Sequence, residues 1–186
     1  MCGRYLYFDG HNQRIAKFID TAKAKLDKEM FDKVNLFEVF PDAYVFAGIY
    51  DDHYHSTIMK WGLHMNKKLV INARAETYRQ SPFFADTKPC VLLCSGYYEW
   101  SKQPKEKYYF SLGEEPMYLA AIYRKEQDEL HFAILTEEAV GDCALIHHRE
   151  PIVLTKENAQ AYCRETAYPV QSCSIHERKI TKASEQ

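Results

Sequence analysis

The chain has 186 residues, of which 46% are hydrophobic and 14% aromatic, and its formal net charge at pH 7 is −2. This composition excludes a disordered chain, and the length suits one globular domain over residues 1–186. The chain lacks an apolar run of about 18 residues and a signal-like N-terminus, so we expect a cytoplasmic protein with no membrane segment. The charge also excludes a uniformly basic surface for nucleic acid.

The first predicted element is an amphipathic helix that begins near His11. Asp9 or Asn12 is its candidate N-cap, because either side chain can accept hydrogen bonds from the first helical turn. Apolar residues then recur at helical spacing and share one face, namely Ile15, Phe18, Ile19, Ala22 and Leu26. Met30 and Phe31 are expected to extend this helix.

After Pro41 the sequence changes to short β-like runs separated by turn signals. The expected strands are residues 44–50, 54–61, 90–95, 107–112, 117–123 and 130–136. Their hairpin-like spacing predicts a largely antiparallel sheet with a barrel-like core. A few peripheral helices complete an α+β fold class.

The C-terminal part of the chain adds three smaller features. Thr155 is expected to cap a short helix that runs through Cys163. Residues 172–180 alternate as a last strand would, and the polar residues 181–186 are expected to fray.

Six cysteines without a secretory signal indicate reduced thiols and no disulfide framework. Cys90 and Cys94 flank an apolar run and share one face of a strand. They could form half of a zinc site, but no second Cys or His pair lies at ligand spacing, so buried core thiols are the favoured interpretation. No metal and no other cofactor is predicted.

The N-terminal sequence Met1-Cys2-Gly3-Arg4 has a chemical property that no internal cysteine shares. Removal of Met1 would leave Cys2 with a free amine and a thiol on adjacent carbons. Such a pair condenses with an aldehyde, first to a Schiff base and then to a five-membered thiazolidine ring. Taken alone, Met-Cys is more simply a start residue beside a small residue.

Two polar stretches lie directly beside apolar runs. Asn72 and Arg74 stand between small residues, where an amide can orient a ligand and a guanidinium fork matches phosphate, although an exposed helix start would look similar. Glu99 lies between Tyr98 and Trp100, and desolvation by aromatics would raise its carboxyl pKa toward neutrality. The simpler alternative for Glu99 is an exposed residue on an edge strand.

Two further stretches carry side chains suited to catalysis or DNA binding. His147 and His148 precede Arg149, and adjacent histidines in an extended chain point to opposite sides, so we expect only one of them in a given site. Trp61 could stack on a nucleobase, and Gly62 after it permits an unusual backbone turn. Surface histidines and a core tryptophan are the alternatives.

Six stretches of the chain, in order, resemble the SRAP family (SOS response-associated peptidase domain; abasic-site processing proteins). They are MCGR at 1–4, KWGL at 60–63, NARAET at 72–77, GYYEW at 96–100, FAILTEEA at 132–139 and IHHREP at 146–151. The resemblance covers most of the chain. It implies that the protein is a covalent trap for abasic sites in single-stranded DNA. It also implies an intracellular protein that is associated with the nucleoid when it is bound to DNA.

The resemblance also implies which residues carry the chemistry. Cys2 is the nucleophile that forms a thiazolidine crosslink with the ring-opened sugar, Asn72 and Glu99 line its pocket, and His147 is the family's histidine. A free thiol titrates near ~8.5 and an α-amine near ~8, so both would be partly reactive at neutral pH. Glu99 can shuttle protons and His147 can protonate the sugar oxygen that leaves. A Schiff base also permits β-elimination, so weak lyase activity is expected.

By the same resemblance, Arg4, Arg74 and Arg149 contact phosphate, and Trp61 offers a surface on which a base stacks. The chain departs from the family pattern at two positions, and both departures are acidic. Glu150 stands where the family has Met between Arg and Pro, and Glu38 stands where many members have Asn. These changes concern the flanking DNA contacts more than the chemistry.

Two other functions remain open from the sequence. Cys2, His147 and Glu99 could form a thiol peptidase whose substrate is the protein's own Met1. Alternatively, the polar cluster only holds phosphates, and the chain is a non-covalent single-strand-binding module.

Overall fold

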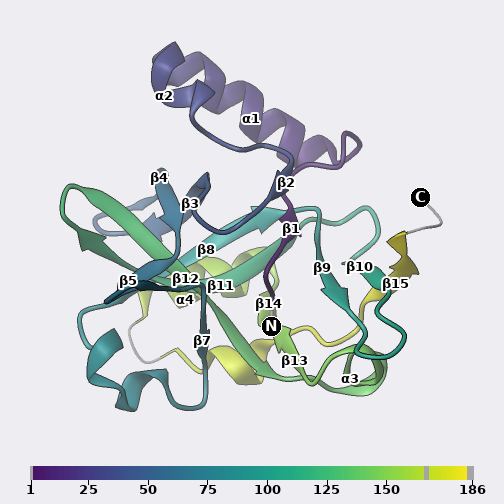
Figure 1. Cartoon of the computed structure of the whole chain (residues 1–186). Coiled ribbons are helices and arrows are strands. Elements are labelled where there is room, and N and C mark those ends of the chain that lie inside the picture. Colours follow the sequence, from purple (N-terminus) through teal and green to yellow (C-terminus); the bar gives the residue numbers. More distant parts are fainter. Residues whose placement is uncertain (1, 166–167, 184–186) are drawn as a thin grey trace.

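The computed structural model describes residues 2–165 and 168–183 (Figure 1). The strands are β1 (Tyr5–Leu6), β2 (Glu38–Val39), β3 (Tyr44–Tyr50), β4 (Tyr54–Trp61), β5 (Leu63–Met65), β6 (Lys68–Val70), β7 (Asn72–Arg74), β8 (Lys88–Cys94), β9 (Gly96–Trp100), β10 (Lys107–Ser111), β11 (Met117–Glu126), β12 (Glu129–Glu138), β13 (Arg149–Pro151), β14 (Val153–Leu154) and β15 (Lys179–Lys182). The helices are α1 (Gln13–Lys25), α2 (Lys28–Asp32), α3 (Gly141–Ile146) and α4 (Lys156–Arg164), with 3₁₀ turns η1 (Tyr78–Gln80), η2 (Pro82–Phe84) and η3 (Val170–Cys173).

Five strands close into a barrel at the centre of the molecule. The order is β12-β4-β3-β8-β11, and β11 pairs back with β12 to complete the ring. Most pairings are antiparallel, whereas β12 runs parallel to both β4 and β7. The predicted α+β class with a largely antiparallel, barrel-like sheet is therefore confirmed. Cys90 and Cys94 of β8 are fully buried free thiols, as predicted.

A second sheet places the N-terminal segment next to the middle of the chain. Its strand order is β15-β10-β9-β1-β2. Tyr5 of β1 pairs with Tyr97 of β9 on one side and with Val39 of β2 on the other. The short strand β1, which lies between β9 and β2, brings Cys2 close to Glu99, because its backbone hydrogen bonds fix the register between the two segments.

The N-terminal helix begins where the sequence predicts but ends earlier. Asn12 is the N-cap of α1, and its side-chain oxygen accepts from the backbone N–H groups of Arg14 and Ile15. The expected extension through Met30 and Phe31 is wrong. Asp27 caps a separate helix, α2, by accepting from the backbone N–H of Met30, and this new cap interrupts the first helix.

The C-terminal elements agree in part with the prediction. Thr155 caps α4 as expected, accepting from the backbone N–H of Asn158. The strand expected over residues 172–180 is mostly absent from the described chain, because Val170–Cys173 form η3 and β15 begins only at Lys179. Residues 181 and 182 pair with β10, so the fraying expected there is wrong, and residues 184–186 lie outside the described residues.

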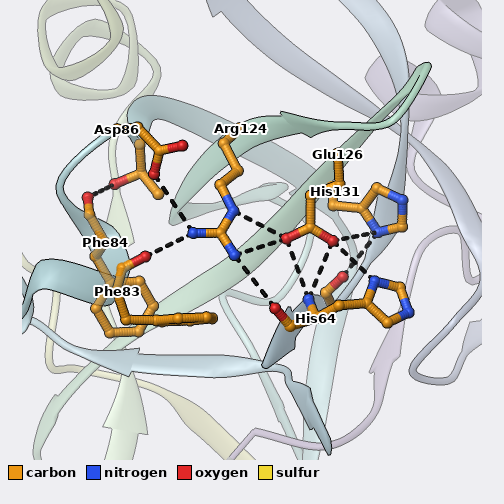
Figure 2. A network of polar contacts seen from close by, with 9 residues as sticks. His64, Phe83, Phe84, Asp86, Arg124, Glu126 and His131 are labelled. Atoms are coloured by element: carbon orange, nitrogen blue, oxygen red, sulfur yellow. Dashed lines mark hydrogen bonds and ion pairs between the residues drawn. The ribbon is translucent and has the colours of Figure 1, made fainter. Parts of the chain in front are cut away.

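The segment from His64 to Phe83, which includes β7, is bound at both ends by Arg124 of β11 (Figure 2). The Arg124 guanidinium donates to the Phe83 carbonyl at 2.6 Å, beyond β7, and to the His64 carbonyl at 3.3 Å, before it. Glu126 joins the network by accepting from Arg124 Nε at 2.9 Å and from the backbone N–H of His64. Asn72 therefore lies on a segment that is held at both ends. Among the described residues, no helix is both long and apolar enough to cross a membrane.

Candidate active site

Cys2 lies in the interior, where Asn72 holds its backbone. The side chain is fully buried, and its Sγ lies 3.9 Å from the Arg4 carbonyl oxygen, to which it donates. Asn72 Nδ2 donates to the Cys2 carbonyl oxygen at 2.9 Å. Asn72 Oδ1 is buried and has no hydrogen-bond partner among the described residues, so the amide retains an acceptor for a ligand.

Glu99 is the buried carboxyl beside Cys2. It lies on β9 and is 5% exposed, and alternation along the strand puts it on the same face as Tyr97. Burial raises its pKa from 4.5 to about 7. The direction predicted from the surrounding aromatics is confirmed, and at neutral pH this carboxyl exists in both protonation states.

The Cys2 thiol is less acidic than the sequence suggests. Burial, and after it the nearby Glu99 charge, raises the pKa of Cys2 well above its ordinary value. The expectation of a partly ionised thiol at neutral pH is therefore wrong for this fold. The thiol must react as the neutral S–H and lose its proton during the reacting step.

His147 lies at the rim, as the C-cap of α3. Its Nδ1 lies 3.0 Å from both the backbone nitrogen and the carbonyl oxygen of Arg149, so the Arg149 backbone fixes the orientation of the ring. Partial burial, and after it the neighbouring cations including Lys102, lowers the pKa of His147. The His147 and His148 rings lie 4.5 Å apart, and the expectation that they point to opposite sides is wrong.

Arg149 is engaged inside the protein in the free chain, and the phosphate contact expected of it stays a prediction. Its guanidinium is buried and donates to both carboxylate oxygens of Glu76, at 2.7 and 2.9 Å, and to the Thr136 carbonyl at 2.6 Å. This bidentate pair fixes the chain after His147. Arg74 is exposed, and its charge contributes to lowering the pKa of the neighbouring His148. Arg74 is thus more accessible to solvent than Arg149.

Glu150 does not add an anion to the surface, contrary to the expectation for this departure from the family pattern. It is 1% exposed, and His176 Nδ1 lies 2.6 Å from its Oε1. Because successive residues of a strand alternate, Glu150 faces away from Arg149 and is covered by the C-terminal segment.

Trp61 belongs to the core, and the base-stacking role expected of it is wrong. The side chain is fully buried, and Nε1 donates to the Ile71 carbonyl at 2.9 Å. Its ring stacks on Phe132 with centroids 6.2 Å apart and also contacts Tyr5. Gly62 follows with φ +124°, the unusual turn that the sequence predicts.

We expect Trp61→Ala to lower the free energy of unfolding by about 3–5 kcal/mol, because it leaves a large cavity in the barrel. Urea denaturation followed by circular dichroism measures this loss. Phe37→Ala is the matched control, since Phe37 is 72% exposed and its loss should cost no more than about 0.5 kcal/mol. Equal stability of the two variants would contradict the core role of Trp61.

The sequence analysis did not predict a set of surface residues that lie beside Arg4. The Arg4 guanidinium lies over the rings of Phe40, at 4.2 Å, and Trp100, at 5.0 Å. Lys107 of β10 lies beside the same cluster, over the Trp100 ring at 5.8 Å. The sequence does carry a signal for Trp100 as a surface residue. If residues 96–100 form a strand, alternation turns Trp100 away from the face that carries Glu99.

The structure therefore brings Cys2, Asn72 and Glu99 together, with His147 at the rim. Among the described residues, the groups of His, Cys, Asp and Glu that could share a metal ion do not include these four. The site offers an amide donor, an imidazole, a thiol and a carboxyl that exchanges protons near pH 7. This combination suits condensation chemistry, in which protons must be both removed and returned.

Comparison with known proteins assigns the family. The family model described as SOS response associated peptidase (SRAP) matches residues 1–183. The chain belongs to the SRAP family. This SRAP chain is 25% identical over 182 residues to the abasic site processing protein YedK of Escherichia coli (strain K12), covering 89% of the chain and 80% of YedK. It is 31% identical over 113 residues to the abasic site processing protein YMR114C of Saccharomyces cerevisiae, covering 52% of the chain and 31% of that protein.

Solved structures share the fold of this SRAP chain. A protein from Bacteroides thetaiotaomicron superposes with a TM-score of 0.73 at 18% identity, covering 97% of this chain and 91% of that one. A phage-related protein from Bordetella bronchiseptica gives a TM-score of 0.70 at 20% identity, covering 98% and 94%. At these identities the likeness concerns the fold alone.

Proposed function

We propose that this SRAP chain captures abasic sites in single-stranded DNA through Cys2, once Met1 has been removed, as a thiazolidine crosslink. The names of the bacterial and yeast relatives support an abasic site as the substrate. Met1 lies outside the described residues. While it precedes Cys2, the Cys2 nitrogen is an amide, so its removal is the activating step.

The observation that carries this proposal is the pairing of Cys2 with a buried Glu99 whose pKa is about 7. The Cys2 amine attacks the aldehyde carbon of the ring-opened sugar and gives a carbinolamine. Protonated Glu99 donates its proton to the hydroxyl, which leaves as water while the C=N bond forms. The resulting iminium keeps its N–H. Ionised Glu99 then takes the thiol proton as sulfur adds to the iminium carbon, so the ring nitrogen becomes a neutral N–H and Glu99 is protonated again. One water is released overall.

The neighbouring residues have supporting roles in this scheme. The Asn72 amide fixes the Cys2 backbone at 2.9 Å and so holds the amine and thiol in place. His147, whose ring the Arg149 backbone orients, protonates the sugar oxygen during ring opening. Exposed Arg74 and partly exposed Arg4 supply phosphate contacts, so binding should weaken with salt. The imine also permits β-elimination, which makes strand cleavage a slower side reaction.

The proposal is tested by incubating the Met1-processed protein with a single strand that contains one abasic site. We expect a heat-stable adduct on a denaturing gel, with an intact mass equal to protein plus DNA minus one water. The matched control is the same strand with an intact base, which should give no adduct. Reversible, salt-sensitive binding to both strands, without any adduct, would instead favour the non-covalent module.

A further inference from the structure

One face of the five-stranded sheet gathers cations and aromatic rings next to the site. Register places Lys107 opposite Trp100, and Tyr98 donates its backbone N–H to the Arg4 carbonyl. Side chains at alternate positions share a face, so Arg4, Tyr98, Trp100 and Lys107 lie together, opposite to the face that carries Glu99. Arg4 is two residues from Cys2, which puts this surface at the edge of the reactive centre.

Glu38 occupies the centre of this surface. Its Oε1 accepts from Lys107 Nζ at 2.8 Å and from Arg4 Nη1 at 3.2 Å. Two cations from different strands thus converge on a single carboxylate oxygen. The three side chains are about one-third exposed, at 33% for Glu38, 29% for Lys107 and 30% for Arg4, so a ligand in solution can reach them.

The surroundings of the two cations suit a nucleic-acid strand. Lys107 Nζ lies 3.8 Å from the centroid of the buried Tyr98 ring. Arg4 lies over the ring of Phe40, which is 44% exposed, and over the partly exposed ring of Trp100. Exposed or partly exposed rings beside paired cations are what a single strand needs, because bases stack on the rings while phosphates bind the cations. A phosphodiester oxygen carries the same charge as a carboxylate and accepts the same donors.

We propose that Arg4 and Lys107 form a phosphate subsite for the DNA strand, and that Glu38 fills this subsite in the free protein and must be displaced when DNA binds. The inference rests on the proposed function for the identity of the strand, but its geometry is that of the free chain. Partial burial alone would raise the pKa of Glu38, yet the hydrogen bond from Lys107 and the charges of Lys107 and Arg4 lower it. Glu38 therefore stays ionised at neutral pH and competes with a phosphate for these two cations.

The displacement model predicts the effect of neutralising Glu38. We expect Glu38→Gln to tighten binding of a fluorescein-labelled oligothymidylate by about three- to tenfold at low salt. The plot of log affinity against log salt should steepen by about 0.7 for each additional phosphate that the variant binds. Fluorescence anisotropy in a Cys2→Ala background measures both quantities without interference from crosslinking. Adding Lys107→Met to Glu38→Gln should return the affinity to that of the parent chain or below.

Glu115→Gln is the matched control, because it removes the same charge from an exposed ion pair with Arg14 outside this surface. We expect it to change affinity by less than about twofold. Equal effects of Glu38→Gln and Glu115→Gln would overturn the inference by showing that only net charge matters. Weaker binding by Glu38→Gln would overturn it as well. The strand used has no abasic site, so failure of the crosslinking proposal would appear in the adduct assay and not here.

Discussion

The Cys2→Ala variant, after removal of Met1, is expected to lose the heat-stable adduct with an abasic strand by about 10²-fold or more. The alanine amine can still form a Schiff base with the aldehyde, but no thiol remains to close the ring. The imine therefore hydrolyses when the sample is heated. Quantitative gel analysis measures this loss, and borohydride should still trap the imine in the variant and so show that the strand binds and the amine reacts.

The control for this variant is Cys94→Ala, which removes another fully buried thiol. As at Cys2, burial raises the pKa of the Cys94 thiol. We expect Cys94→Ala to form the adduct at a rate close to that of the unmodified chain. A heat-stable adduct formed by Cys2→Ala at the normal yield would refute the thiazolidine mechanism.

Replacing Glu99 by Gln is expected to slow adduct formation by about 10²- to 10⁴-fold, the usual contribution of a positioned acid–base group. In the unmodified protein the rate should fall as pH rises through about 7, because the protonated donor is lost there. The variant should lack this limb of the pH profile. Initial rates between about pH 5 and about pH 9 measure it.

Glu106→Gln is the control, since Glu106 is an acid of the same sheet region that pairs with Lys182 and Tyr108. It should keep both the rate and the limb near pH 7. An unchanged pH profile in Glu99→Gln would show that another group is the proton donor.

The raised pKa of Glu99 also has a consequence for stability that does not depend on DNA. Between pH 4.5 and about 7 the folded chain keeps a proton that the unfolded chain has released. Stability therefore falls as pH rises through this window, by about 3 kcal/mol in total, and stays lower above it. Glu99→Gln should remove this loss and be more stable than the unmodified chain above pH 7. Urea denaturation at several pH values checks the sign.

Local sequence patterns were enough to predict the structural features that depend only on residues close by in the chain. Asn12 and Thr155 are predictable as helix caps because the donors they satisfy lie two or three residues away. The raised pKa of Glu99 follows from the aromatic residues next to it. The predicted helix extension to Met30 fails because Asp27 is itself a local cap, which the apolar periodicity does not reveal.

The sequence by itself determined which residues the proposed chemistry uses: a cysteine that can become N-terminal, and the polar residues Asn72, Glu99 and His147 in family order. Only the tertiary structure decided which charged and aromatic side chains are available to a ligand. Arg149 is held by Glu76, 73 residues away, and Trp61 is covered by the barrel, whereas Lys107 and Arg4 meet at Glu38. These partners lie far apart in the sequence. Burial and ion pairing depend on such long-range contacts, and a local sequence pattern does not predict them.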